Sequence, residues 1–342
     1  MAFPDVLEQL RRHEDLTSAQ AAEVMGTIMD GHAPPSHIAA LLMALALKGE
    51  RPAELVGFAQ AMRARAVPFA TAVLDVFDTC GTGGDGAHTF NVSTASAFVA
   101  AAAGARVAKH MGRSVSSSSG SAEVLEALGA NLDMTQEQTG EAIEKLGLGF
   151  MFAPAHHAAM KYAAPVRKDL GVRTIFNILG PLTNPAGAQS QLLGVFHPDL
   201  VGIQTRVLQR LGSKHVMTVF GLEGLDEISI SGETMVGELV NGEINEYTIH
   251  PQQFGIELYD RRAIQVNTVE ESRQMIQAVL ENQPGPALNI VLLNAGAAIY
   301  VSGVVESLQA GIDRARRVIA KGEAKQKLDD FVAFTQRVKA KG

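Results

Sequence analysis

The chain has 342 residues, and its 29 basic and 36 acidic side chains give a formal net charge of −7. With 46% hydrophobic and 19% charged residues it can bury a large core, which excludes dominant disorder, and its acidic balance argues against general nucleic-acid binding. The single cysteine, Cys80, excludes an internal disulfide and favours the cytoplasm, and we expect neither export nor a membrane segment, because no signal-like or membrane-spanning apolar run is present.

The first 70 residues show helical patterns only. Thr17 and Gln20 form a capping-box pattern ahead of an apolar periodic run, and Gly31 ends that run. Prolines mark the starts of two further runs. Four helices are predicted, over residues 3–12, 18–30, 37–48 and 52–66. The third is apolar on most faces, which indicates burial against another surface such as a second subunit.

From residue 73 onwards, short β-prone runs alternate with helical stretches. Strands are predicted over 73–79, 106–109, 149–152, 192–196 and 216–221, and helices over 93–103, 122–128, 136–146 and 200–211. This alternation predicts a mostly parallel sheet flanked by helices. Runs at 228–231, 235–240 and 244–249 predict a small antiparallel addition, and helices at 269–280, 287–300 and from 304 close the chain.

The predicted fold class is therefore α/β. A small all-helical N-terminal domain covers residues 1–70, and a large α/β domain with a mostly parallel central sheet covers residues 71–342.

A glycine-rich loop at residues 81–86 follows the first predicted strand and precedes a predicted helix. Its four glycines let the backbone approach a ligand and point N–H groups inward, and the helix N-terminus adds partial positive charge. The pattern is neither the dinucleotide fingerprint nor a P-loop. It predicts an anion cradle, with a Gly-rich turn that binds nothing as the alternative.

The stretch between Asp85 and Glu123 contains no acidic side chain, yet it carries Arg106, Lys109 and Arg113. It is also rich in serine from residue 114 to residue 121. A basic, hydroxyl-rich segment in an acidic chain indicates a small ligand that is rich in phosphate.

A pair of carboxylates, Asp226 and Glu227, follows an apolar strand. Such a pair suits Mg²⁺ ions that also bind substrate phosphates, although isolated acidic pairs are usually solvated surface. Together with the glycine loop and the basic segment, the pair predicts Mg²⁺-assisted chemistry on a polyphosphate.

Five segments stand out in order along the chain: GTGGD at 81–85, NVST at 91–94, SGSA at 119–122, RTIFNILGPLTNP at 173–185 and GLDE at 224–227. Together they resemble the anthranilate phosphoribosyltransferase family. The resemblance covers nearly the whole chain in order. It implies a helical dimerisation domain, joined in space by helices near 160–185, and an active site in a cleft beside the large domain. Pyrimidine nucleoside phosphorylases share this fold and a related loop, and they remain an alternative, as does a non-catalytic nucleic-acid-binding relative.

The resemblance implies that a homodimer transfers the phosphoribosyl group of 5-phosphoribosyl 1-pyrophosphate (PRPP) to the amine of anthranilate. This reaction is the second step of tryptophan biosynthesis from chorismate, and two Mg²⁺ ions per subunit would assist it. The implied PRPP-binding residues are Gly81, Gly84, Asp85, Thr89, Asn91, Val92, Ser93, Thr94, Lys109, Ser117 and Ser121. The implied anthranilate-binding residues are Gly81, His110, Gly112, Ala153, Pro154, His157 and Arg167. The implied metal ligands are Ser93, Asp226 and Glu227, and the candidates for an electrostatic or positioning role are Lys109, His110 and Arg113.

One departure from the family concerns the anthranilate side. Where family members read Gly-Asn-Arg after Lys-His, this chain reads Met111-Gly112-Arg113. Met111 puts a bulky side chain where the family's glycine allows close backbone approach. Gly112 has no side-chain amide with which to bind the substrate, and the loss of such a contact costs about 1 kcal/mol. We therefore expect PRPP binding to be retained while anthranilate binding or turnover is impaired.

Overall fold

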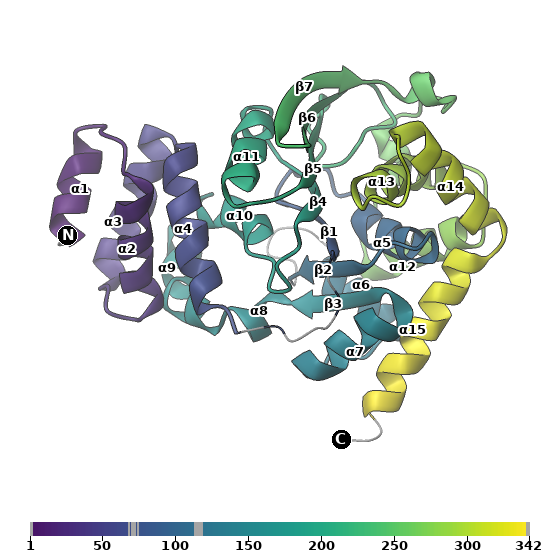
Figure 1. Cartoon of the computed structure of the whole chain (residues 1–342), viewed down its shortest axis with the longest axis horizontal. Helices are drawn as coiled ribbons and strands as arrows, with labels where there is room; N and C mark the ends of the chain where they lie inside the picture. Colours follow the sequence, from purple (N-terminus) through teal and green to yellow (C-terminus); the bar gives the residue numbers. More distant parts are fainter. Residues whose placement is uncertain (1–2, 68, 70–72, 74, 113–118, 340–342) are drawn as a thin grey trace.

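The computed structural model describes residues 3–67, 69, 73, 75–112 and 119–339. A helical module lies at one end of the molecule and contains the N-terminus, and the α/β part with the C-terminus makes up the rest (Figure 1). The four helices predicted for the module are confirmed: α1 (Phe3–Arg11), α2 (Ser18–Met29), α3 (Pro35–Lys48) and α4 (Pro52–Arg65). The capping box at α2 is present, since Thr17 Oγ1 accepts from the Gln20 amide at 3.2 Å.

Helices α2 and α4 pack closely because Gly57 has no side chain. A Cβ at this position would overlap the Ser18 carbonyl oxygen and crowd Ala21. Helix α3 turns Ile38 and Leu45 inward, while Leu47 is 77% exposed. The module therefore has a tight interior and one apolar side chain that stands out of its surface.

The large part is built on a seven-stranded sheet in the order β3-β2-β1-β4-β5-β6-β7. The strands are β1 (Phe77–Gly81), β2 (Val107–Met111), β3 (Leu148–Phe152), β4 (Ser190–Gly194), β5 (His215–Gly221), β6 (Thr234–Val240) and β7 (Glu243–Ile249). The first five are parallel, as expected, and β6 and β7 add an antiparallel edge. The chain runs outward from β1 in one direction to β2 and β3 and in the other from β4, so a topological switch point lies between β1 and β4.

The strand predicted at 228–231 is wrong. Residues 228 and 229 have no regular structure, residues 230 and 231 lie in a bend, and the Ile230 carbonyl accepts from the Tyr259 amide at 3.0 Å. Asn294 Oδ1 accepts from the Ile228 amide at 2.9 Å, and Asn294 Nδ2 donates to the Ile228 carbonyl at 3.0 Å. The first strand also begins later than predicted, at Phe77 instead of residue 73.

Neighbouring residues of the central strands belong to different cores. Leu192 and Met217 pack in the core beneath α5, α13, α14 and α15, whereas Leu193 and Val216 pack in the core that continues into the helical module. Both faces of the sheet are therefore covered, as a parallel sheet requires. The remaining helices are α5 (Val92–Ala102), α6 (Ser121–Ala127), α7 (Gln136–Leu146), α8 (Ala153–His156), α9 (Ala164–Leu170), α10 (Phe176–Leu179), α11 (Asp199–Arg210), α12 (Val269–Leu280), α13 (Pro286–Val301), α14 (Leu308–Ala320) and α15 (Glu323–Lys339).

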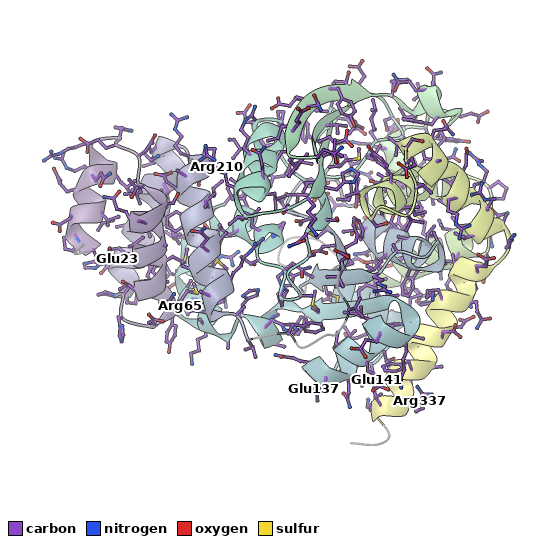
Figure 2. The ribbon with its side chains drawn as sticks, in the orientation of Figure 1. Glu23, Arg65, Glu137, Glu141, Arg210 and Arg337 are labelled. Atoms are coloured by element: carbon purple, nitrogen blue, oxygen red, sulfur yellow. The ribbon has the colours of Figure 1, made fainter. Side chains whose placement is uncertain are left out.

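The segment from residue 158 to residue 182 connects the sheet to the helical module. Its helix α9 contacts α3 and its helix α10 contacts α4. Arg63 of α4 donates from Nε to the Leu182 carbonyl at 2.7 Å. Charged side chains such as Arg65, Glu137 and Arg337 lie at the periphery (Figure 2). Within the described ranges, no helix combines the length and the apolar character needed to cross a bilayer.

The close contact at Gly57 can be tested by Gly57→Ala. Because the added methyl group must displace backbone of α2, we expect the free energy of unfolding to fall by about 1–3 kcal/mol in chemical denaturation. Gly202→Ala in α11 is the matched control, since its Cβ would meet only the flexible ends of Arg206 and Glu246. Equal stability of the two variants would contradict the close packing of α2 against α4.

Candidate active site

The glycine loop lies at the carboxyl end of β1, beside the switch point. Gly83, Gly84 and Gly86 have φ values of 64°, 74° and 70°, a backbone region that other residues rarely adopt. The loop is tied to the end of β4, because the Thr82 amide donates to the Gly194 carbonyl at 2.9 Å. Its N–H groups are thereby held at the edge of the sheet where α/β proteins bind ligands.

Lys109 lies in β2 and is only 2% exposed. Its ammonium group donates to the Thr79 carbonyl and, at 3.1 Å, to Ser93 Oγ. An ammonium group has three hydrogens, so one remains for a ligand. The structure therefore brings together a lysine and a serine that were predicted separately to meet phosphate and metal.

The loop after β5 brings Asp226 against the glycine loop. Asp226 Oδ2 accepts from the Gly83 amide at 2.9 Å, and the Asp226 amide faces Asp85 Oδ2 at 3.4 Å. Burial and then the charge of Asp85 raise the pKa of Asp226 above its ordinary value. Burial and the charge of Asp226 raise the pKa of Glu227, and Lys109 and a hydrogen bond from the Ser93 backbone oppose this rise.

These carboxylates fit Mg²⁺. Oxygen donors are the ligands that this hard cation prefers, and burial together with neighbouring carboxylates raises the pKa values of Asp226 and Glu227, an effect that a bound cation would oppose. Among the described residues, no three His, Cys, Asp or Glu side chains form a ready cage for a metal. Mg²⁺ is commonly held by one or two carboxylates together with substrate phosphates, so an incomplete protein cage suits an ion that shares its ligands with a phosphate substrate.

Asn91 connects the other predicted PRPP residues to the scaffold. Its Oδ1 accepts from Ser119 Oγ at 2.8 Å and from Ser272 Oγ at 2.7 Å, so it joins the end of the serine-rich segment to α12. Ser121 begins α6, and Thr89 forms an isolated bridge with Gln265. The Val92 and Thr94 side chains are buried at the start of α5.

Two histidines lie close together on the other side of Lys109. The His110 and His157 ring centroids are 5.3 Å apart, and both side chains are buried. His157 Nε2 lies 3.0 Å from the Thr183 carbonyl oxygen, whereas the buried His110 Nε2 has no partner among the described residues. Burial lowers the pKa of His110 to about 3 and also lowers that of His157, so burial favours the neutral form of both rings.

The remaining predicted anthranilate residues come from neighbouring short helices. Ala153 and Pro154 begin α8, directly after β3. Arg167 lies in α9 with its guanidinium 5.3 Å from the Phe176 ring centroid, and burial lowers its pKa. No salt bridge between described residues involves Arg167.

The two residues of the Met111-Gly112 departure lie in different surroundings. Met111 is the last residue of β2, and its side chain packs in the core beneath α5. Gly112 is exposed, and a Cβ there would meet no described atom within 4 Å. Among the described residues, no atom occupies the place where the side chain of the family's asparagine would begin. Arg113 and Ser117 were also predicted site residues, and they lie outside the described residues.

Three contacts at the site were not predicted from the sequence. Arg173 donates to the Gly84 carbonyl, and its guanidinium lies 4.5 Å from the Phe196 ring centroid. Asp78 and Asn184 form a buried hydrogen bond of 2.7 Å. Asp78 had a visible signal, because it is the one charged residue in an otherwise uncharged strand.

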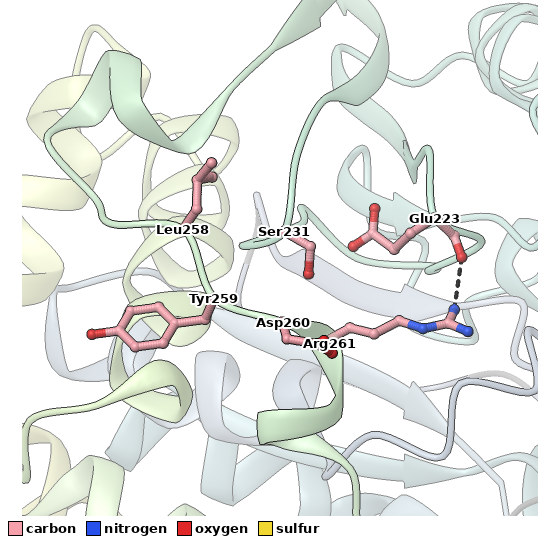
Figure 3. Close-up of a pocket in the computed structure, with 6 residues that line it drawn as sticks. All are labelled: Glu223, Ser231, Leu258, Tyr259, Asp260 and Arg261. Atoms are coloured by element: carbon pink, nitrogen blue, oxygen red, sulfur yellow. Dashed lines mark hydrogen bonds between the residues drawn. The ribbon is translucent and has the colours of Figure 1, made fainter.

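A surface pocket of about 450 Å³ contains none of the predicted site residues (Figure 3). Arg261 Nη1 donates to the Glu223 carbonyl at 2.7 Å across it. The pocket is lined by Glu223, Ser231, Leu258, Tyr259, Asp260 and Arg261. Its connection with the site is the loop that carries both Glu223 and Asp226.

Two domains of known families match the chain. The helical bundle domain of the glycosyl transferase family matches residues 4–66, and the a/b domain of the same family matches residues 74–325. Among curated proteins, the anthranilate phosphoribosyltransferase of Leptothrix cholodnii is 57% identical, with 98% of this chain and 97% of the relative covered. That of Nitrosospira multiformis is 56% identical, with the same coverage. These names agree with the resemblance seen in the sequence and not with the pyrimidine nucleoside phosphorylase alternative.

The solved structures that are similar to this chain agree with these sequence matches. Anthranilate phosphoribosyltransferase from Thermus thermophilus is 43% identical with a TM-score of 0.92, and 97% of this chain and 99% of that chain are covered. The Saccharomyces cerevisiae enzyme, solved in complex with PRPP and Mg, is 24% identical with a TM-score of 0.88 and 98% coverage of both chains. Since both domains match and relatives more than half identical span nearly the whole length, the chain belongs to the anthranilate phosphoribosyltransferase family.

Proposed function

We propose that this protein transfers the phosphoribosyl group of PRPP to the amine of anthranilate, giving N-(5-phosphoribosyl)anthranilate and pyrophosphate. One observation carries the proposal: the glycine loop, Lys109 and the carboxylate loop with Asp226 meet at one end of the sheet, beside two buried histidines. The first three groups suit a metal-bound pyrophosphate, and the histidines border the space next to it.

Charge development explains the roles of the residues on the PRPP side. The bond from ribose C1′ to pyrophosphate breaks, and the electron pair leaves with the pyrophosphate oxygen. The Lys109 ammonium and the N–H groups of the glycine loop stabilise this growing negative charge. The ribose becomes oxocarbenium-like, and the anthranilate nitrogen attacks C1′ from the opposite face.

The metal site would consist of Ser93, Asp226 and Glu227, and we propose two Mg²⁺ ions per subunit. Mg²⁺ bound there would neutralise charge on the pyrophosphate. Asp226 Oδ2 also accepts from the Gly83 amide at 2.9 Å, so the carboxylate that would hold the metal contacts the glycine loop as well.

Anthranilate would bind beside His110 and His157, with Arg167 opposite its carboxylate, because a guanidinium fork can bind two carboxylate oxygens. An aryl ammonium is acidic, so its proton can pass to a weak base. A neutral imidazole such as that of His110, whose Nε2 has no partner among the described residues, meets this need. Holding both substrates in line would supply much of the remaining acceleration.

The direct test follows the fluorescence of anthranilate with PRPP and Mg²⁺. We expect the fluorescence to decay as the amine is phosphoribosylated, and we expect no decay when PRPP is left out. An enzyme that instead releases free base from pyrimidine nucleosides in a phosphate-dependent reaction would contradict the proposal.

We expect anthranilate turnover to depend on Mg²⁺ and on the carboxylate pair Asp226 and Glu227. Chelation with EDTA should abolish the decay, and excess Mg²⁺ should restore it. Asp226→Asn should lower kcat on the order of 10²-fold, because it removes electrostatic stabilisation of the leaving group. Glu223→Gln is the control, since it lies in the same loop and keeps an oxygen that can accept from Ser229. Equal losses in the two variants would show that the loop's structure matters rather than Asp226 as a ligand.

The Gly112 position allows a gain-of-function test. Gly112→Asn adds an amide at a position where no described atom lies within 4 Å of the new Cβ, so we expect the KM for anthranilate to fall about fivefold, the equivalent of about 1 kcal/mol. The KM for PRPP should not change. Met111→Gly is expected to destabilise the core without this gain, because Met111 is buried there. An unchanged anthranilate KM in Gly112→Asn and in the double variant Met111→Gly/Gly112→Asn would refute this account of the departure.

We further propose that the protein is a homodimer formed through the N-terminal helices. Ala40, Met43 and Leu47 follow one another at helical spacing along the outer side of α3, and Leu47 is 77% exposed. The cytoplasmic location expected from the single cysteine stays a prediction.

Leu47→Glu tests the dimer. A charge placed in an apolar interface should shift the mass measured by light scattering from dimer towards monomer, with the unfolding free energy of the subunit nearly unchanged. Leu258→Glu, at a 43% exposed position of the large domain, should leave the mass unaltered. Dimers in both variants would place the interface elsewhere.

A further inference from the structure

Strands β1 and β2 part from each other towards the site. The two strands are paired at one position, between Phe77 and Val107, where the Phe77 amide donates to the Arg106 carbonyl at 2.8 Å. By contrast, β1 pairs with β4 at five positions, from Phe77 to Gly81, and β2 pairs with β3 at five positions. Of these three strand pairs, β1 with β2 is therefore the one that loses its pairing towards the site, and these two strands carry the glycine loop and Lys109.

Two buried side chains replace the missing backbone bonds. Asp78 Oδ1 accepts from the His110 amide at 3.1 Å, and Asp78 Oδ2 accepts from Asn184 Nδ2 at 2.7 Å. Asn184 Nδ2 also donates to the Ala108 carbonyl at 2.9 Å, and its Oδ1 accepts from the Ala186 amide at 2.9 Å. Every polar atom of both side chains is therefore used.

These bonds hold the two peptide groups on either side of Lys109. The Ala108 carbonyl belongs to the peptide before Lys109, and the His110 amide belongs to the peptide after it. With both peptides fixed, the direction in which the lysine side chain leaves β2 is fixed as well. Lys109 enters the gap and reaches the Thr79 carbonyl and Ser93 Oγ.

The same turn also holds the second histidine. Thr183 directly precedes Asn184, and its carbonyl oxygen lies 3.0 Å from His157 Nε2. Thus one dipeptide contacts His157 by its backbone and, through Asp78, the backbone of His110.

Stability alone gives no reason for this arrangement. Ordinary pairing of β1 with β2 would satisfy the same amide and carbonyl without burying a carboxylate, which is costly. The parting of the strands, however, gives the Lys109 side chain a place between them.

We propose that Asp78 and Asn184 are positioning residues that set Lys109 towards the pyrophosphate of PRPP and His110 and His157 towards anthranilate. This inference rests on the proposed function for its substrates. The residues touch neither substrate, and they act through the backbone of β2 and the turn at 183–184.

The test uses Asn184→Leu, Asp78→Asn and the exchange Asp78→Asn/Asn184→Asp. Asp78→Asn keeps an oxygen for the His110 amide but sets an NH₂ group against that of Asn184, and the exchange restores a donor–acceptor pair. Calorimetric titration with Mg²⁺ and PRPP, and steady-state kinetics below the unfolding temperature, are the readouts. We expect Asn184→Leu and Asp78→Asn to lower PRPP affinity and kcat on the order of 10²-fold, with partial recovery in the exchange.

Gln204→Met is the matched control. Gln204 is a buried amide that donates to the Ile178 carbonyl at 3.1 Å, away from β1 and β2, so its loss should lower thermal stability while kcat and PRPP affinity stay as in the wild type. Asn184→Ser, which removes the same amide, serves if Asn184→Leu does not fold.

Variants at Asn184 that lose only stability, as Gln204→Met does, would overturn the inference. A wild-type protein without anthranilate turnover would instead refute the proposed function. In that case the titration with Mg²⁺ and PRPP still decides the positioning role, because it involves no anthranilate.

Discussion

The burial of charged side chains is the physical constraint that organises the carboxyl end of this sheet. Lys109 and Asp78 are both buried on adjacent strands, and three more carboxylates gather where the loops after β1 and β5 meet. Buried charges are tolerated only when hydrogen bonds and opposite charges surround them. The parted strands, the turn at 183–184 and the glycine loop all supply such partners.

Two glycines without backbone strain make this meeting of loops possible. Gly81 and Gly194 pair across β1 and β4, and a Cβ on either would overlap Asp226. Because β4 lies between β1 and β5, the loop after β5 must pass over the end of β4 to reach the glycine loop. The crossing requires that this strand end carry no side chain.

Local signals explain what could be predicted from the sequence. Caps, prolines and apolar periodicity act within a few residues, so the helical module and most strands were predicted within a few residues of their ends. The glycine loop and the Asp226–Glu227 pair could be recognised because each is contiguous. The failures involve distant partners: Asn294, 66 residues away, binds the backbone amide of Ile228 where a strand was predicted, and Asn184 reaches Asp78 across 106 residues. No local pattern contains such pairings.

The two cores that share the sheet also limit how such a chain can change in length. Since neighbouring residues of β4 and β5 face opposite cores, the insertion or deletion of one residue would move every following side chain of the strand to the wrong face. The central strands can therefore diverge by substitution but not by single-residue indels. Changes of length are confined to the turns, such as the one at Asn241–Gly242 between β6 and β7, where no core depends on the alternation.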